Sequence, residues 1–357
     1  MRAQHALSVA VRVAVPAGGV RHARSPPLLD TAPVTDSTSG TPPPDRLPGD
    51  QSPTGRPDAG APVLVLANAS AGSAETAEVA AVLRRLRGLA EVEVAVPGRD
   101  GELSDLVAGA AGRAVVVVGG DGSLNGVLQA MVERDVLAAV GPVGLVPLGT
   151  GNDFARGHGV PLDPQRAAQV ALTGRTRSVG LLHDDQGRVV VNVVHVGVAA
   201  EATAHAEDVK GLLGRTGYLV GAVRAGIGAL GWRLRVLVDD EVVLDGGSRT
   251  LMVSVALGRS VGGGTPVAPT AAPEDGLADV VVCTATGWAA RLGFARDLRA
   301  GRHLGRADVR VLRGRRVHVE ALAGESFGIN ADGDLVGRRR RSTWTLEPQA
   351  WRIRTAG

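Results

Sequence analysis

The stretch AVVVVGGDGSLNGVLQAM, residues 114–131, constrains the fold more than any other part of the chain. Four consecutive valines between small residues predict a short strand that is buried on both faces. Leu124, Val127, Leu128 and Met131 then recur at the spacing of one face of a helix. The stretch therefore predicts a strand, a tight turn and a helix in direct succession.

The turn in this stretch combines glycines with one carboxylate. Gly119, Gly120 and Gly122 carry no Cβ, so the backbone can approach a ligand closely, and Ser123 is placed to cap the helix. Backbone N–H groups and the positive end of the helix dipole then point at one spot, which suits phosphate. Asp121 would bind a ribose or, through water, a Mg²⁺ ion on the phosphates. The alternative is that Asp121 only caps the helix and that the glycines only permit tight packing.

Strands and helices alternate on either side of this stretch. The expected elements are a strand at Val63–Ala67, a helix at 74–89, a strand at 92–96, a helix at 102–111 and a strand at Val143–Pro147. This order predicts an α/β fold with a parallel sheet and helices on both faces. Ligands are then expected at the carboxyl ends of the strands.

A second glycine-rich turn follows the last of these strands, in PLGTGNDFARGHG. Gly149 and Thr150 are followed by the polar side chains of Asn152 and Asp153. Arg156 comes three residues after Asp153, a spacing at which a carboxylate can hold a guanidinium within one helical turn. The turn could be only a capped helix start. We interpret two such turns on consecutive strands as two walls of one nucleotide site.

From about residue 177 onward, alternating or apolar runs replace the helical periods. The expected strands are 189–199, 233–238, 249–257, 278–284, 307–311, Arg316–Ala321 and 343–353, with one helix at 204–226. We therefore expect an α/β domain over residues 61–178 and a β-rich domain over 179–342. Residues 1–60 hold ten of the 20 prolines and show no sustained period, which predicts a disordered leader or a start codon farther downstream.

Composition excludes several classes of protein. The only lysine, Lys210, follows no glycine-rich loop, which excludes a mechanism with a Walker lysine. A formal charge of +3 does not indicate a nucleic-acid partner. The single cysteine, Cys283, lies in an apolar run and indicates a reducing compartment. No apolar stretch reaches the roughly 18 residues of a membrane helix, so we expect a cytoplasmic protein.

With GGDGSLNGVL and PLGTGNDFAR in one chain, the sequence resembles the diacylglycerol kinase catalytic family. That family includes bacterial soluble diacylglycerol kinases, related bacterial lipid kinases and sphingosine kinases, and it shares its fold distantly with NAD kinases. Further matching segments are NVVHVGVAAE, LLGRTGYLVGAV, GGGTPVAPTAAPEDGLADVVV and INADGDLV. Several motifs in the family's order are more specific than any one of them.

The resemblance implies an ATP-binding α/β domain and a C-terminal β-sandwich whose last strand, about 343–357, returns to the first domain. ATP would lie over the first glycine-rich turn, with help from the second. The expected nucleotide-binding positions are Asn68, Gly119, Gly120, Asp121, Gly122, Ser123, Leu124, Asn125, Gly149, Thr150 and Asn152.

The resemblance also implies catalytic and metal positions. The Asp153 and Arg156 pair matches active-site positions, and Asp332 falls where the family places the general base for the lipid hydroxyl. Asp334 stands where glutamate is usual. The expected Mg²⁺ ligands are Asp275, backbone carbonyls near Ala272 and Leu277, and Asp121. By spacing alone, the DG steps at 275–276 and 332–333 fit hairpin turns better than sites, and only the family resemblance favours the site roles.

Two further positions depart from the family's pattern. The stretch after the first strand begins with Asn68 but lacks the usual lysine, so Arg156 would carry more of the work of the family's Lys-Asp-Arg network. Ser123 replaces the usual threonine and keeps the hydroxyl. A nucleotide- or lipid-binding protein without turnover is therefore one alternative, and an NAD kinase is another.

Two further motifs fit other kinds of site less well. GRSVG at 258–262 matches the nucleophile elbow of hydrolases around Ser260, but GGGTPVAPTAAP cannot form the helix that must follow an elbow. Glu201, His205 and Asp208 would share one helical face as a metal cluster, although a solvated polar face explains them equally well.

We therefore expect an ATP- and Mg²⁺-dependent lipid kinase that converts a membrane-borne alcohol, foremost diacylglycerol to phosphatidic acid. Such a substrate requires transient, peripheral contact with a membrane. The basic run at 338–341 would meet anionic headgroups, or is a solvated turn. The sequence does not separate glycerolipids from sphingoid bases, and a homodimer is an open alternative to a monomer.

Overall fold

The computed structural model describes residues 62–67, 73–98, 101–198, 200 and 231–357. Some predictions concern other residues and lie outside the described part of the chain. These are the leader at 1–60, Asn68, the group Glu201, His205 and Asp208, and the helix at 204–226.

Four strands of the N-terminal half form the predicted parallel sheet, in the order β2-β1-β3-β4. They are β1 (Val63–Ala67), β2 (Val92–Ala95), β3 (Val115–Gly119) and β4 (Val143–Pro147). The helices between and after them are α1 (Ser73–Arg87), α2 (Glu102–Ala108), α3 (Asp121–Glu133), α4 (Asp153–His158) and α5 (Pro164–Thr173). The prediction of an α/β domain is confirmed.

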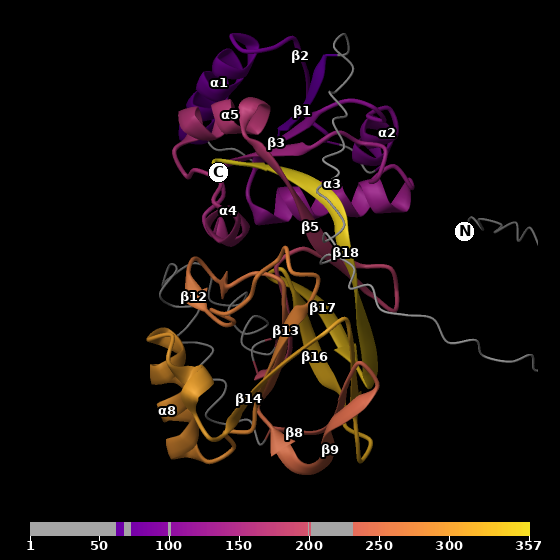
Figure 1. Cartoon of the computed structure of the whole chain (residues 1–357), viewed down its shortest axis with the longest axis vertical. Helices are drawn as coiled ribbons and strands as arrows, with labels where there is room; N and C mark the ends of the chain where they lie inside the picture. The colour runs from indigo at the N-terminus through magenta and orange to yellow at the C-terminus, as the bar shows by residue number, and fades with distance from the viewer. Residues whose placement is uncertain (1–61, 68–72, 99–100, 199, 201–230) are drawn as a thin grey trace, which may run out of the picture. The chain divides into compact units, whose positions relative to one another are not determined.

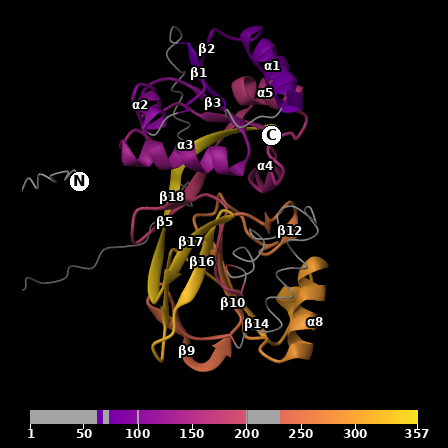
Figure 2. The same ribbon diagram turned by 180° about the vertical axis from the view of Figure 1, so that it is seen from behind.

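The four valines of β3 explain why this strand is central. Val115 and Val117 pack into an apolar cluster with residues of α2 and α3. Val116 and Val118 point the other way and pack with residues of α1 and α5. Because side chains alternate along a strand, a continuous valine run buries both faces of the sheet. Figures 1 and 2 show these helices around the parallel strands.

The C-terminal half contains an antiparallel sheet of six strands, in the order β14-β13-β10-β7-β16-β17. Its strands are β7 (Val193–Gly197), β10 (Met252–Ala256), β13 (Ala278–Cys283), β14 (Val309–Gly314), β16 (Phe327–Ala331) and β17 (Asp334–Arg339). A two-stranded hairpin of β11 (Ser260–Val261) and β12 (Thr265–Pro266) and the helix α8 (Trp288–Arg299) complete this half.

The remaining strands belong to the same ten-stranded sheet as β1 to β4. They are β5 (Arg175–Asp184), β6 (Val189–Val190), β8 (Trp232–Val238), β9 (Glu241–Thr250), β15 (Arg316–Ala321) and β18 (Arg341–Thr355). The long strand β18 pairs with β15 near its start and with β4 at Ile353. The expected return of the last strand is therefore present, and it joins both halves in one sheet (Figure 1).

An apolar core fills the space between the two sheets of the C-terminal half. Val236 of β8 and Val319 of β15 belong to one buried cluster with Val255 of β10 and Val280 of β13. The alternating patterns that predicted strands thus supply the inner faces of a β-sandwich.

Several elements differ from the sequence predictions. The single strand expected at 249–257 is two strands, because the chain passes at Leu251 from β9 in one sheet to β10 in the other. The helices α5 and α8, the strand β5 and the separate strands β16 and β17 were not among the expected elements. A run of apolar residues indicates that a segment is buried, but it does not indicate where the chain passes from one sheet to the other.

Candidate active site

The two glycine-rich turns lie against each other, as predicted. A Cβ built on Gly149 would lie 2.5 Å from the Cα of Gly120, so the two backbones touch at this point. This contact corrects the expectation that Gly120 leaves room for a ligand. A Cβ on Gly122, by contrast, would meet no atom within 4 Å. Gly122 is therefore the glycine of the first turn that a ligand can approach.

Asp121 and Ser123 occupy positions different from those predicted. The helix α3 begins at Asp121, with Gly120 as its N-cap, so Ser123 lies inside the helix and does not cap it. Asp121 instead caps another helix: its carboxylate accepts the N–H groups of Asp153 at 3.0 Å and Phe154 at 3.2 Å, in the first turn of α4. Burial raises the pKa of the Asp121 carboxyl above its usual value.

Asp153 does not pair with Arg156. The buried carboxylate of Asp153 accepts the hydroxyl of Ser260 at 2.8 Å and the N–H groups of Gly263 at 2.7 Å and Gly264 at 2.8 Å. Arg156 is exposed and donates to the carbonyl of Gly151. The predicted ion pair is wrong because the start of α4 packs on the β11–β12 hairpin, whose donors take the carboxylate.

Ser260 therefore holds Asp153 and does not form a nucleophile elbow. It lies in a two-residue strand that turns directly into β12. The sequence prediction that no helix follows Ser260 is confirmed. The contact between Ser260 and Asp153 was missed by sequence reasoning, because the two residues are 107 positions apart.

Asp332 occupies the turn between β16 and β17, where its φ of 50° and the φ of 100° at Gly333 form a tight hairpin. Its carboxylate accepts four N–H groups. The donors are the side chain of Asn125 at 2.8 Å and the backbones of Val191 at 2.7 Å, Asn192 at 2.9 Å and Val193 at 2.9 Å. Burial raises the pKa of Asp332 to about 6 in spite of these donors. The hairpin interpretation of this residue is confirmed, and its predicted role in the site stays a prediction.

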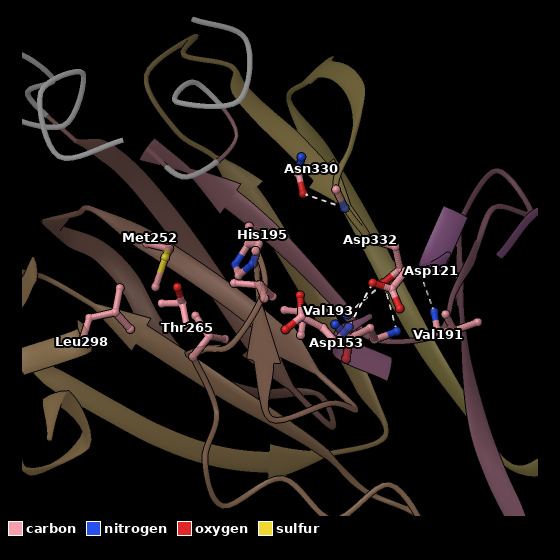
Figure 3. A pocket seen from close by; sticks show the side chains of 15 residues that line it. Asp121, Asp153, Val191, Val193, His195, Met252, Thr265, Leu298, Asn330 and Asp332 are labelled. Carbon is pink, nitrogen blue, oxygen red and sulfur yellow. Dashed lines mark hydrogen bonds between the residues drawn. The ribbon is translucent and has the colours of Figure 1, made fainter. Parts of the chain in front are cut away.

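A cavity of about 250 Å³ connects these carboxylates to apolar side chains. Asp121, Asp153 and Asp332 line its polar part, and Met252 and Leu298 line its apolar part (Figure 3). Asp334 is exposed and does not line this cavity. The polar end thus lies beside the glycine-rich turns, and the cavity continues along the six-stranded sheet.

A second cavity, of about 190 Å³, lies between the end of β1 and the start of α3. Gly122 and Ser123 line it together with Ala67. The exposed Thr150 does not line either of these two cavities.

Three of the predicted nucleotide-binding side chains are engaged within the protein. Leu124 is buried in the core, and Asn125 donates to Asp332 and to the carbonyl of Val189 at 3.1 Å. Asn152 is buried and donates to the carbonyl of Gly149 at 2.7 Å. These contacts within the protein hold the three side chains in place, and their predicted role in nucleotide binding stays a prediction.

The predicted Mg²⁺ loop is arranged around an arginine. The carboxylate of Asp275 pairs with the guanidinium of Arg313 and accepts the N–H of Leu277 at 3.0 Å. The carbonyl of Ala272 accepts the N–H of Asp275 at 3.1 Å. A guanidinium at this carboxylate already neutralises it and repels a second cation, so this loop does not fit Mg²⁺. Within the described ranges, no three His, Cys, Asp or Glu side chains form a group that could hold a metal ion.

Two family models together match most of the described chain. The diacylglycerol kinase catalytic domain matches residues 62–183, and the YegS C-terminal NAD kinase beta sandwich-like domain matches residues 192–355. A Pseudomonas aeruginosa protein named probable lipid kinase YegS-like is 32% identical over 297 residues, which cover 82% of this chain and 93% of that protein. The chain belongs to the diacylglycerol kinase family of lipid kinases. The family resemblance and the fold class predicted from the sequence are confirmed.

Other members of the family align over similar lengths. A Mycobacterium tuberculosis protein named diacylglycerol kinase is 30% identical to this lipid kinase over 275 residues, 74% of this chain and 85% of that protein. The crystal structure of a diacylglycerol kinase from Bacillus anthracis superposes with a TM-score of 0.62 at 17% identity, over 82% of this chain and 96% of that one. The structural match shows a shared fold. In the part of the kinase that the structure describes, no helix is both long and apolar enough to span a membrane.

Proposed function

We propose that this lipid kinase transfers the γ-phosphate of ATP to the free hydroxyl of a diacylglycerol and forms phosphatidic acid. The observation that carries this proposal is the cavity with a carboxylate end and an apolar end. A diacylglycerol has the same division, because one hydroxyl is attached to two apolar chains. The hydroxyl would lie among the carboxylates and the chains would run toward Met252 and Leu298.

The geometry supports a nucleotide on the other side of Asp121. Gly122 is exposed and open, and the second cavity begins at Gly122 and Ser123. Both residues belong to the first turn of a 13-residue helix, whose N–H groups and dipole favour phosphate. We assign the phosphates of ATP to this end of α3. The active-site role predicted for Arg156, which is exposed beside the second turn, stays a prediction.

Among the three carboxylates, Asp121 is best suited to accept the proton of the lipid hydroxyl. A carboxylate has about four acceptor positions. Asp332 already accepts four N–H groups and Asp153 accepts three hydrogen bonds, whereas Asp121 accepts two. Asp121 therefore has the most acceptor capacity left; burial raises the pKa of both Asp121 and Asp332, so the number of hydrogen bonds already made is what distinguishes them. The general-base role predicted for Asp332 stays a prediction, and its contacts support a positioning role.

About two acceptor positions of Asp121 remain, so one can take the lipid hydroxyl while the other accepts a water molecule of a Mg²⁺ ion that arrives with the phosphates of ATP. Bound there, the ion would neutralise phosphate charge. Asp121 would orient it, and Asp153 would keep the β11–β12 hairpin against α4. The Asp275 loop takes no part in this proposal, because Arg313 already neutralises its carboxylate.

The test is transfer of labelled phosphate from ATP to diacylglycerol in mixed micelles with Mg²⁺. We expect labelled phosphatidic acid, and lower kcat/KM with sphingosine, phosphatidylglycerol or NAD as the acceptor. Preference for one of these acceptors would replace the proposed substrate. A protein that binds ATP but labels none of the four would instead be a binding protein without turnover.

A further inference from the structure

A buried histidine lies between the two ends of the cavity. His195, on β7, is 5% exposed and lines the cavity (Figure 3). Its Nδ1 lies 2.8 Å from the hydroxyl of Ser254, its direct cross-strand partner on β10. Nε2 has no hydrogen-bond partner within the described ranges. The sequence showed only a polar residue inside the apolar run NVVHVG.

The contact with Ser254 determines which nitrogen of His195 carries the hydrogen. The hydroxyl of Ser254 is fully buried, and His195 is its only partner in the described part of the chain. A buried hydroxyl hydrogen without an acceptor is costly, so the hydroxyl donates to Nδ1. Nδ1 is then unprotonated, and Nε2 carries the hydrogen. Burial lowers the pKa of His195 to about 4, so the ring is neutral at pH 7.

We propose that the Nε2–H of His195 is a binding subsite for an ester carbonyl oxygen of the lipid acceptor. This inference rests on the proposed function. Val193, two residues earlier on β7, donates to Asp332 at the polar end of the cavity. Because two residues of a strand span about 6.5 Å, His195 lies only a short way along β7 from the polar end, within the reach of a lipid whose hydroxyl lies there. A carbonyl has only acceptor positions, so it matches a donor in an otherwise apolar wall.

The experiment compares two acceptors with equal chains, a diacylglycerol with two esters and a dialkylglycerol with two ethers. For wild type we expect kcat/KM to favour the ester by about fivefold to tenfold, the effect of one ordinary hydrogen bond. His195→Phe fills the same space without an N–H, so it should lose this preference and phosphorylate both lipids at the ether level. Ser254→Ala removes the hydroxyl that keeps Nδ1 unprotonated, so the ring hydrogen can also lie on Nδ1. The preference for the ester should therefore fall in part.

The outcomes separate this inference from the proposed function. Equal use of ester and ether by wild type, or a preference that persists in His195→Phe, would overturn the subsite alone. If wild type phosphorylates neither lipid, the proposed substrate fails. Calorimetric binding of a short-chain diester and its diether, without ATP, then tests His195 independently of turnover. Thermal melting of each variant shows that the fold is kept.

An independent observation concerns the outer face of α8. Trp288 is 72% exposed, and Leu292, one helical turn later, is 44% exposed. On the inner side, Phe294 is buried and Leu298 lines the cavity. The same helix therefore carries an exposed apolar pair and one wall of the proposed lipid site.

The charge around this apolar pair is positive. Arg296, Arg299 and Arg302 are exposed at the end of α8 and just after it. Asp297, the only acid in the helix, pairs with Arg296 at 3.3 Å, with Arg302 at 3.8 Å and with Arg306 at 3.0 Å, so one carboxylate is shared among three guanidinium groups. Tryptophan prefers the boundary between water and lipid, and arginines attract anionic headgroups. Charge complementarity thus favours an anionic membrane as the partner of this face.

We infer that the α8 face, formed by Trp288, Leu292, Arg296, Arg299 and Arg302, docks on an anionic membrane. Docking there would bring the Leu298 side of the cavity near the lipid from which the substrate is taken. Trp288 also provides a probe, because the other three tryptophans, Trp232, Trp344 and Trp351, are at most 7% exposed.

The experiment uses full-length protein and vesicles of phosphatidylcholine with or without phosphatidylglycerol. Anionic vesicles should shift tryptophan emission to the blue, and Trp288→Phe should abolish the shift. In a cosedimentation assay, the double variant Trp288→Ala, Leu292→Ala should have about tenfold lower affinity for the anionic vesicles. The reason is that two apolar side chains no longer enter the membrane. Leu162→Ala, at another exposed leucine, is the matched control and should bind like wild type.

Turnover of a water-soluble short-chain diacylglycerol keeps this test separate from the proposed function. We expect the double variant to phosphorylate it at the wild-type rate. Unchanged vesicle binding by the double variant would overturn the membrane assignment. The assignment would also be wrong if light scattering showed that the substitutions split a dimer while vesicle binding persisted, because the face would then be an interface between two copies.

Discussion

Asp121→Asn is expected to lower kcat for phosphate transfer by about 10²–10⁴-fold, the range that a positioned proton acceptor contributes. Asparagine removes the negative charge that takes the proton of the lipid hydroxyl and faces Mg²⁺. It keeps an acceptor for one of the two N–H groups at the start of α4, so stability should fall by about 1–3 kcal/mol for the N–H group that loses its acceptor. The measurement is kcat at saturating ATP and lipid, together with thermal melting.

The matched control is Asp105→Asn, which removes an exposed carboxylate of α2 that pairs with Arg134. We expect wild-type kcat from it. The assignment of Asp121 would be wrong if Asp121→Asn kept kcat within about twofold while Asp332→Asn, with its fold intact, lost turnover. Asp332 would then be the proton acceptor, as the family resemblance implied.

Gly149→Ala is expected to destabilise the protein by about 1–3 kcal/mol and to lower activity with it. Its Cβ would lie 2.5 Å from the Cα of Gly120 and 2.9 Å from Oδ1 of the buried Asn152. The Cα of Gly120 is backbone and cannot rotate away, and the side chain of Asn152 is held by its hydrogen bond to the carbonyl of Gly149. The two turns must therefore separate to make room for the added Cβ. Chemical denaturation of the variant measures the loss.

Gly122→Ala is the control from the same turn. Its Cβ meets no atom within 4 Å and lies in the first turn of α3, where alanine favours a helix. Stability should therefore be unchanged or slightly higher, whereas the KM for ATP should rise if phosphate approaches this backbone. A Gly149→Ala protein as stable as Gly122→Ala would contradict the close packing of the turns.

Local patterns were sufficient for the parts of the fold that depend on neighbours in the chain. The valine run of β3 predicted a strand, and the periodic apolar residues of α3 predicted a helix. Both predictions were possible because buried residues are spaced differently along strands and along helices. The strand order predicted the edge at which Gly120 and Gly149 meet. Motifs in sequence order were enough to indicate the family, which the comparisons confirm.

The partners of the site residues depended on contacts that no local pattern records. Asp153 and Arg156 are near enough in sequence to pair, yet Asp153 binds the β11–β12 hairpin 107 to 111 residues away. Asp332 reaches Asn125 across 207 residues, and Asp275 pairs with Arg313 rather than leaving a place for Mg²⁺. The sequence by itself therefore determined the four parallel strands, the helices between them and the family. Only the tertiary structure decided which donors each carboxylate meets, because a buried charge takes whichever partners the packing of distant strands brings to it.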